Sequence, residues 1–197
     1  MESWIEVNIV PAGVEGAALL TGLVDEIVHG ELATEIETWF FFWEPELRLR
    51  VRWRDAALAD ACRSRLCARL DRSRAEGAIA AWHEGAHGHP GERYLGEADR
   101  YGDEVWQRVQ ADWMNGSEFA VLLAKLERAG SLTRPRRFHW ERHVHLFTNQ
   151  LYGSWEAEVE LCLAQALGYL RHIRAGGAVP SPTTLGLLDE LDAVART

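Results

Sequence analysis

The sequence predicts an α+β fold in which an antiparallel sheet over residues 1–82 precedes a mainly helical half. Three observations support this prediction. Apolar and charged residues alternate strictly from Leu47 to Arg54, as in a strand with one buried face. The expected elements of residues 1–82 follow the order βαββαβ, the split βαβ arrangement. From residue 101 onward, apolar residues recur mainly at helical spacing.

The first half of the expected sheet comes from the amino-terminal residues. Ile5–Val10 is a short strand that ends before Pro11. Residues 14–28 form a helix that ends near Gly30, and Glu35–Trp43 is a strand rich in aromatic residues. The apolar positions that define this helix are Leu19, Leu20, Leu23, Val24 and Ile27. Glu44-Pro45 is a turn signal between the aromatic strand and the next one.

The alternating segment 47–54 places apolar side chains on one face and a row of arginines on the other. That row consists of Arg48, Arg50, Arg52 and Arg54. The row has two interpretations. It is either a solvated strand face or the floor of a groove that holds an acidic ligand, because guanidinium groups bind carboxylates and phosphates in a bidentate manner.

A second helix and a fourth strand complete the expected sheet domain. Asp55 caps a helix that runs to about Ala75, and Ala78–Trp82 is the strand. A loop over 83–93 leads to the helical half, with helices at about 101–114, 117–129, 139–151 and 155–174. A Gly/Pro linker then precedes a last helix at 183–195. We expect a single domain over residues 1–197, with residues 178–197 forming the C-terminal helix after the linker.

Composition excludes several classes of protein. The formal net charge is −9, which disfavours direct nucleic-acid binding. No apolar run approaches the roughly 20 residues of a membrane helix, and residues 1–4 lack the features of a secretion signal, so we expect a cytoplasmic protein. The three cysteines suggest reduced thiols. The nine tryptophans are accounted for mostly by core packing and are compatible with a homodimer.

Two groups of histidines are candidates for chemistry. His83-Glu84-Gly85-Ala86-His87 matches the HExxH string of zinc peptidases. Such a zinc site needs a helix, but Gly85 within the string and Gly88 and Gly91 after it favour a mobile loop. We therefore expect no metal there and no other cofactor. In the second group, His145 precedes Asn149 by one helical turn, which suits either a structural role or a positioned acid or base.

Four stretches of the sequence, in order, resemble the C-terminal, elimination-type domain of class I lantibiotic dehydratases. That family also occurs as free-standing thiopeptide-type bacteriocin biosynthesis proteins. The aromatic strand, the Glu-Pro turn and the Leu-Arg-Leu-Arg strand match over residues 40–50. The family pattern Tyr-x-x-Glu-x-x-Arg-Tyr-Gly is present at Tyr94, Glu97, Arg100, Tyr101 and Gly102. Gly116-Ser117 stands at the place of an Asp-Ser motif, and His145–Gly153 resembles the last motif, with Glu158 following it.

Three positions depart from the family pattern. Glu46 replaces a histidine, Asp103 replaces a second glycine, and Gln150 replaces an arginine. These departures make the reaction that the chain catalyses less certain to match the family than its membership of the family.

The resemblance implies an enzyme that acts on the leader and modified core of a precursor peptide. Its reaction would be the elimination of glutamate from glutamylated Ser or Thr to give dehydroamino acids. The resemblance implies Arg48, Arg100 and His145 as catalytic residues. The residues expected to bind substrate are Arg50, Arg52, Tyr94, Glu97, Tyr101, Ser117 and Asn149. A glutamylating dehydratase subunit is the implied protein partner.

Two alternatives stay open. The same scaffold resembles the pyridine synthases of thiopeptide pathways, which perform a formal [4+2] cycloaddition. A non-catalytic partner that binds the peptide or scaffolds a dehydratase is the other. The three departures favour these alternatives, whereas the retained Arg48, Arg100 and His145 favour the elimination.

Overall fold

The sheet is the centre of the described structure. The computed structural model describes residues 3–13, 15–43, 46–136 and 138–139, all within the first of the two units of the chain, Met1–His139. The four strands are β1 (Trp4–Pro11), β2 (Ile36–Trp43), β3 (Leu47–Trp53) and β4 (Ile79–Glu84). They form one antiparallel sheet in the order β2-β3-β1-β4. The predicted α+β class and split βαβ arrangement are therefore confirmed.

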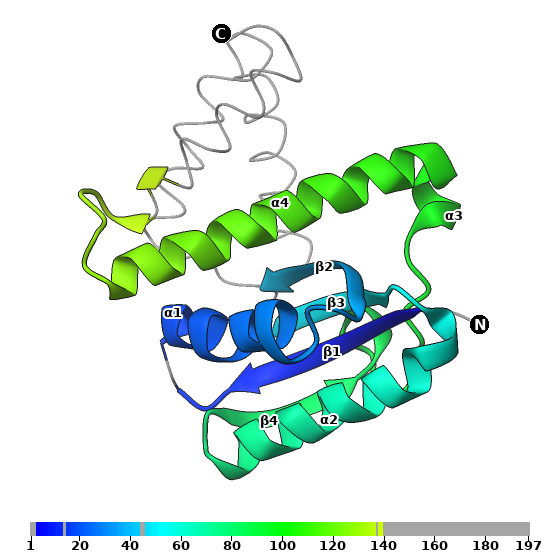
Figure 1. Cartoon of the computed structure of the whole chain (residues 1–197), viewed down its shortest axis with the longest axis horizontal. Coiled ribbons are helices and arrows are strands. Elements are labelled where there is room, and N and C mark those ends of the chain that lie inside the picture. Colours follow the sequence, from blue (N-terminus) through cyan, green and yellow to red (C-terminus); the bar gives the residue numbers. More distant parts are fainter. Residues whose placement is uncertain (1–2, 14, 44–45, 137, 140–197) are drawn as a thin grey trace, which may run out of the picture. The chain divides into compact units, whose positions relative to one another are not determined.

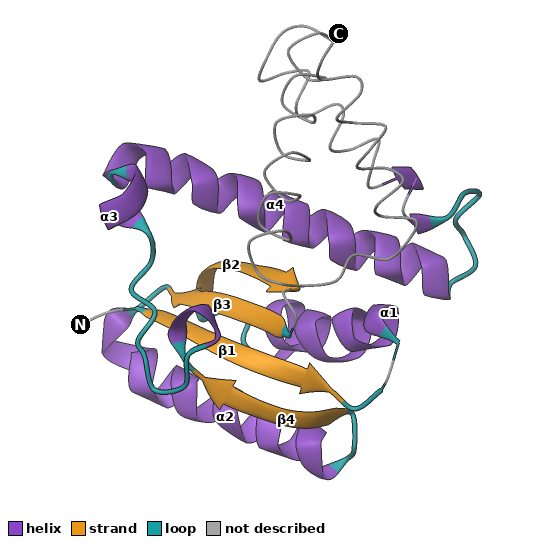
Figure 2. Ribbon diagram, turned by 180° about the vertical axis from the view of Figure 1, so that it is seen from behind, coloured by secondary structure: helices purple, strands orange, loops and turns teal. Residues whose placement is uncertain are grey.

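Helices on one face of the sheet supply the main core (Figures 1 and 2). The first begins as α1 (Gly16–Leu19) and continues with π-helical turns, η1 (Leu20–Val24) and η2 (Glu26–Glu31). The second begins with the 3₁₀ turn η3 (Ala56–Leu58) and continues as α2 (Ala59–Ala75). The side chain of Asp55 accepts a hydrogen bond from the Ala57 N–H at 2.8 Å, which confirms the predicted cap.

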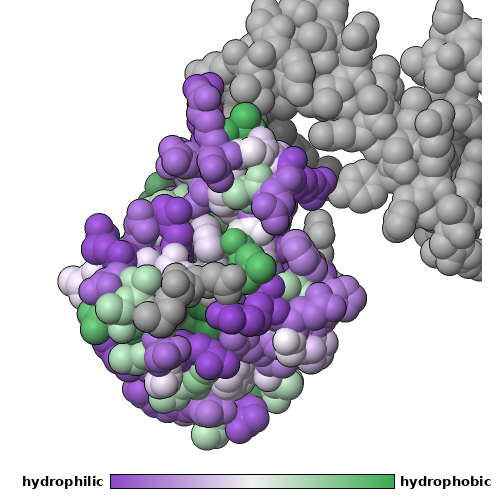
Figure 3. All heavy atoms as spheres, turned by 90° about the vertical axis from the view of Figure 1, so that its right-hand side faces the viewer, coloured by the Kyte–Doolittle hydropathy of each residue, from purple (hydrophilic) through white to green (hydrophobic). Residues whose placement is uncertain are grey.

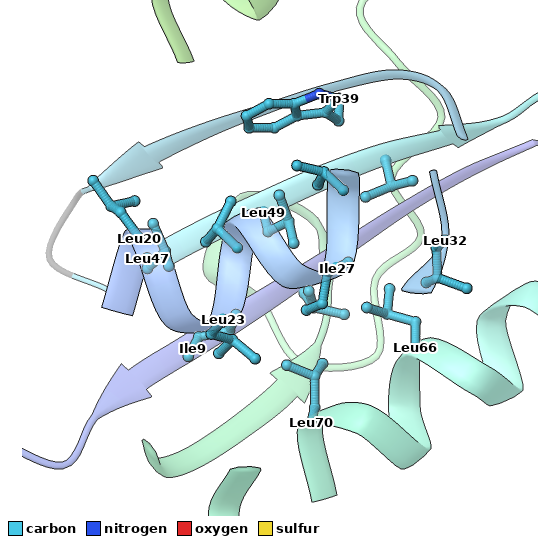
Figure 4. Close-up of a cluster of buried hydrophobic side chains, with 14 of the residues drawn as sticks. Ile9, Leu20, Leu23, Ile27, Leu32, Trp39, Leu47, Leu49, Leu66 and Leu70 are labelled. Carbon is cyan, nitrogen blue, oxygen red and sulfur yellow. The ribbon is translucent and has the colours of Figure 1, made fainter. Parts of the chain in front are cut away.

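The apolar half of the alternating strand lies in this core (Figure 4). Leu47, Leu49 and Val51 of β3 are fully buried. They belong to one cluster with Ile27 of the first helix and Leu66 of α2. The alternation of β3 therefore separates an apolar face under the two helices from an opposite face that carries the arginines.

The helical segment after the sheet differs from the sequence-based prediction. A short helix α3 (Ala98–Tyr101) leads into one helix, α4 (Asp103–Arg128), where we expected two helices separated near Gly116. A glycine inside a helix costs only about 1 kcal/mol relative to alanine. Packing on both sides of Gly116 offsets this cost, because Met114 and Val121 both contact the main core.

Several expectations fall outside the described residues. These are the helices at 139–151, 155–174 and 183–195 and the linker before the last one. The single domain over 1–197 stays a prediction. Within the described residues, none of the helices is both long and apolar enough to cross a membrane.

Candidate functional site

The face of the sheet opposite α1 and α2, called here the polar face, carries the candidate site. Strand register arranges its side chains in three cross-strand rows. The first row is Phe42, Arg48, Asn8 and His83; the second is Phe40, Arg50 and Glu6; the third is Thr38, Arg52 and Trp4. The predicted arginine row is thus real, but its members have different surroundings.

Arg50, in the second cross-strand row, is held by several protein partners. Its Nε donates to Glu6 Oε2 at 2.6 Å and its Nη1 to Glu97 Oε1 at 2.8 Å. Its guanidinium carbon lies 4.2 Å from the centre of the Tyr94 ring. Burial also raises the pKa of the Tyr94 phenol, so this group stays neutral. Arg50 is only 2% exposed, and its donors are committed to protein partners, so it holds the site together.

A tight turn covers part of the polar face. It is η4 (Ala86–Gly88), which follows directly on β4 and Gly85. Glu6 Oε1 accepts a hydrogen bond from the Gly88 N–H at 3.2 Å, and Asn8 Nδ2 donates to the Gly85 carbonyl at 2.6 Å. A Cβ on Gly85 would lie 2.1 Å from the His89 carbonyl oxygen, so this position requires glycine.

The HExxH string lies on the end of β4 and the turn that follows, so the strand includes His83 and Glu84, which we expected in the loop over 83–93. His83 faces the polar side of the sheet, in the row of Arg48 and Asn8. Glu84, the next residue of the strand, bonds Arg63 of α2 at 2.7 Å. Across the described residues, no three potential metal-ligating side chains come together.

Arg48 differs from the other arginines of the row. It is half-buried, and within the described residues no carboxylate or other acceptor bonds its guanidinium. Gly88 lies against it, since a Cβ built there would be 3.3 Å from Arg48 Nη2. In the same row, the buried Asn8 Oδ1 and His83 Nε2 also have no hydrogen-bond partner in the part of the chain described. Arg48 is thus a half-buried cation with no side-chain acceptor among the described residues.

Arg52, the next arginine along β3, is ion-paired through Nη2, whereas its buried Nε has no hydrogen-bond partner among the described residues. It pairs with Glu37 at 2.9 Å and lies with its guanidinium carbon 5.6 Å from the centre of the Trp4 ring.

Glu97 links the polar face to Arg100. One carboxylate oxygen of Glu97 binds Arg50, and the other lies 3.5 Å from Arg100 Nη1. The Arg100 side chain is 73% exposed, so its guanidinium is open to solvent. Tyr101 stacks on Trp106 of α4, with ring centres 6.1 Å apart. The structure thus brings Arg50, Tyr94, Glu97, Arg100 and Tyr101 into one connected group.

An aromatic cluster beside this group was missed by the sequence analysis. Its rings are Trp4, Phe40, Phe42, Tyr94, Tyr101, Trp106 and Trp113. The two tryptophans of α4 are seven residues apart, which is two helical turns, and this spacing was the available signal. The cluster fixes the start of α4 against the polar face.

The remaining predicted residues have separate locations. Ser117 is buried on α4, and its hydroxyl accepts a hydrogen bond from the Phe41 N–H at 3.0 Å. Because β2 is an edge strand, this contact covers an otherwise open backbone donor. His145 and Asn149 lie outside the described residues.

The surface near the amino-terminal end of α4 is neither uniformly hydrophilic nor uniformly hydrophobic. In the view of Figure 3, the described residues are mostly hydrophilic, and the hydrophobic ones form small separate groups. Leu95 and Val105 are among the exposed apolar residues of this part of the chain. The polar face therefore offers the most distinctive chemistry among the described residues.

Comparison with protein families decides the relationship. The model of the lantibiotic biosynthesis dehydratase C-terminal family matches residues 4–178. The chain belongs to this family. A comparison with curated proteins gives no match.

A solved structure of a larger protein supports the fold of this family member. It is the crystal structure of the tRNA-dependent lantibiotic dehydratase MibB from Microbispora sp. 107891. The TM-score is 0.52 at 22% sequence identity. The match covers 64% of this chain and 12% of MibB, so the chain corresponds to a small part of that protein.

One departure from the family pattern has a structural explanation. Gly102 adopts a φ of +78°, in the left-handed region that favours glycine, and so ends α3 and starts α4. Asp103, at the place of the second family glycine, is the first residue of α4. A carboxylate at this end of a helix interacts favourably with the helix dipole. Asp103 therefore supports the start of the helix.

Proposed function

We propose that this chain eliminates glutamate from glutamylated Ser or Thr residues of a lantibiotic-type precursor peptide. The observation that carries the proposal is the Arg48 guanidinium, which lacks an acceptor among the described residues and stands in a buried, ion-paired frame. A preorganised cation of this kind binds a carboxylate without reorganising its surroundings.

The reaction has definite electrostatic requirements. A base removes the α-proton of the modified residue, the Cβ–O bond breaks, and the glutamyl group leaves as free glutamate while the Cα=Cβ bond forms. Negative charge develops on the carbonyl next to the α-carbon and on the leaving carboxylate, so cations must lie nearby. Arg48 and Arg100 suit these roles. His145, the base that the family motif implies, lies outside the described residues.

The buried frame has a supporting role in this proposal. Arg50 fixes Glu97 at 2.8 Å, and Glu97 in turn lies beside Arg100. Because Arg50 is enclosed by Glu6, Glu97 and Tyr94, it orients the exposed arginine while Arg48 stays open to the substrate.

Replacing Arg48 is the direct test. With the purified chain and a glutamylated precursor peptide, mass spectrometry should record loss of glutamate for the natural protein. Arg48→Ala should reduce the rate by roughly a hundredfold, the usual effect of removing one transition-state donor. Arg54→Ala is the matched control, because Arg54 lies at the exposed end of the same row. Equal rates for Arg48→Ala and the natural protein would refute this role.

The cyclase remains a second candidate because of the substitutions at Glu46 and Gln150. A cycloaddition depends on shape and hydrogen bonding more than on strong acids and bases. The same protein should therefore be incubated with a fully dehydrated precursor peptide. Release of the leader together with a cyclised core would favour the cyclase. Binding of peptide without either reaction would favour the non-catalytic role.

A further inference from the structure

His87 has an unusual backbone conformation for its residue type. At φ 53° and ψ 28°, it is the one non-glycine residue with positive φ in the part of the chain described. Such conformations are uncommon outside glycine and persist where the surrounding structure enforces them. Here the enforcement is visible, because Asn8 holds the Gly85 carbonyl and Glu6 holds the Gly88 N–H on either side of His87.

The contacts of the His87 ring determine its tautomer. Its Nδ1 lies 3.1 Å from Arg50 Nη2, and a guanidinium can only donate. Nδ1 must therefore accept, which places the ring proton of the neutral imidazole on Nε2. The rings of His87 and Tyr94 also pack in a T-shaped arrangement, with an angle of 76° between their planes and 5.8 Å between their centres. His87 as a residue is exposed. Its Nε2–H is consequently a donor of fixed orientation, with no bond to it among the described residues.

The same turn lies against Arg48. Gly88 follows His87 directly and packs against the Arg48 guanidinium, whose Nη2 lies 3.3 Å from the Cβ position of Gly88. Gly88 itself has a φ of +82°. His87 is therefore the chain neighbour of the residue that packs against Arg48, whose guanidinium has no acceptor among the described residues. This combination of an imidazole and a guanidinium suits a carboxylate, which accepts from several donors at once.

We propose that His87 and Arg48 together bind the side-chain carboxylate of the glutamyl group. This inference rests on the proposed function for the identity of its ligand. A glutamyl ester derived from aminoacyl-tRNA is linked through its α-carboxyl group, so its side-chain carboxylate stays free before elimination. Recognition of that group makes His87 a determinant of specificity for glutamyl over neutral acyl groups, and explains why the turn holds it in the left-handed region.

Binding to stable analogues separates this inference from the reaction. Two precursor peptides are compared, in which diaminopropionate replaces the modified serine and carries either a glutamyl or a glutaminyl group through an amide bond. They differ only in a carboxylate against a carboxamide, and neither can undergo the elimination. Calorimetry on the full chain should show roughly tenfold tighter binding of the glutamyl peptide, the effect of one charge-assisted hydrogen bond.

Replacement of His87 should weaken this preference. His87→Ala and His87→Asn should each reduce the preference for the glutamyl peptide severalfold, and what is left comes from Arg48. Asn tolerates the left-handed conformation, so this variant keeps the turn. His89→Ala, in the same exposed loop but with an extended backbone, should keep the preference. Thermal melts check that each variant is folded.

The outcomes separate the two proposals. If the natural chain binds both peptides equally, or if a folded His87→Asn variant keeps the full preference, the His87 subsite is wrong, whatever the chain does to a glutamyl ester. If the preference depends on His87 but glutamyl esters are not processed, the subsite stands and the elimination fails.

Discussion

The Nε–H of Arg50 meets the carboxylate of Glu6 at 2.6 Å between the two central strands, and both side chains are almost fully excluded from water. A buried pair of this kind has little net effect on stability compared with an apolar replacement of both partners. Removal of one partner is costly because it leaves an uncompensated charge.

Glu6→Ala should therefore lower the free energy of unfolding by about 3–5 kcal/mol. Combining it with Arg50→Met should cost less than the sum of the two single changes, because the loss of the Glu6–Arg50 pair is then counted once, although Glu97 keeps only its longer contact with Arg100. Urea denaturation measures both. As a control, Glu37→Ala removes the exposed partner of Arg52 and should change stability by less than about 1 kcal/mol. Strict additivity of the first two changes would contradict the role of this pair.

Two glycines should respond in opposite directions to alanine. Gly116 lies inside α4, with no atom within 4 Å of its Cβ position, so Gly116→Ala should stabilise the protein by about 1 kcal/mol. Gly102 also has free space, but its φ is +78°. Gly102→Ala should destabilise by about 1–2 kcal/mol. Thermal melts of the two variants against the natural chain give the signs, and destabilisation by Gly116→Ala would indicate that α4 is broken there.

The strands were predictable because their signals are local. The alternation at 47–54 and the Asp55 cap depend on neighbouring residues, and both were placed to within a few residues. The single helix α4 was not predicted, because its continuity at Gly116 depends on packing against distant strands. For the site, the arginine row could be read from the sequence. The choice of Arg50 as the buried member could not, since it depends on Glu6 and Glu97, which are 44 and 47 residues away.

Replacing Ser117, a residue expected to bind substrate, distinguishes a structural role from a role in substrate binding. Its hydroxyl accepts from the Phe41 N–H, and Ser117→Ala leaves that donor without its partner. The free energy of unfolding should fall by about 1–3 kcal/mol. Elimination by the folded variant should continue near the natural rate, measured by mass spectrometry below its melting temperature. A large loss of rate without loss of stability would instead assign Ser117 to the substrate.

His29 should make stability depend on pH. Its Nδ1 bonds Asp25 at 2.7 Å and its Nε2 bonds Glu118 of α4 at 2.9 Å. Burial by itself lowers the pKa of His29, but the bonds to the two carboxylates outweigh it and raise the pKa above its ordinary value. The stabilisation is therefore fully present below the unfolded pKa of about 6.5 and is lost as the pH rises through the higher folded pKa.

Between about pH 6 and pH 8, the natural chain should lose roughly 0.5 kcal/mol more stability than His29→Gln, a modest value because the His29 side chain is 39% exposed. Urea titrations of both proteins at the two pH values isolate this contribution from those of the other histidines. The same pH dependence in both proteins would exclude His29 as its source.

Replacing Arg100 tests whether this exposed partner of Glu97 takes part in the reaction. Its side chain is 73% exposed, and its 3.5 Å pair with Glu97 is long, so Arg100→Ala should change the free energy of unfolding by less than about 1 kcal/mol. If Arg100 stabilises charge in the transition state, the same change should slow glutamate loss by roughly a hundredfold. Arg108→Ala is the control, because Arg108 is similarly exposed and pairs with a glutamate of its own helix α4, Glu104, at 2.8 Å. Glu97→Gln keeps the shape of the bridge but weakens its hold on both arginines, so it should reduce the rate while also lowering stability through Arg50. Arg100→Ala and Arg108→Ala variants with equal rates would remove Arg100 from the mechanism and leave Arg48 as the sole cation in the described residues proposed to act on the substrate.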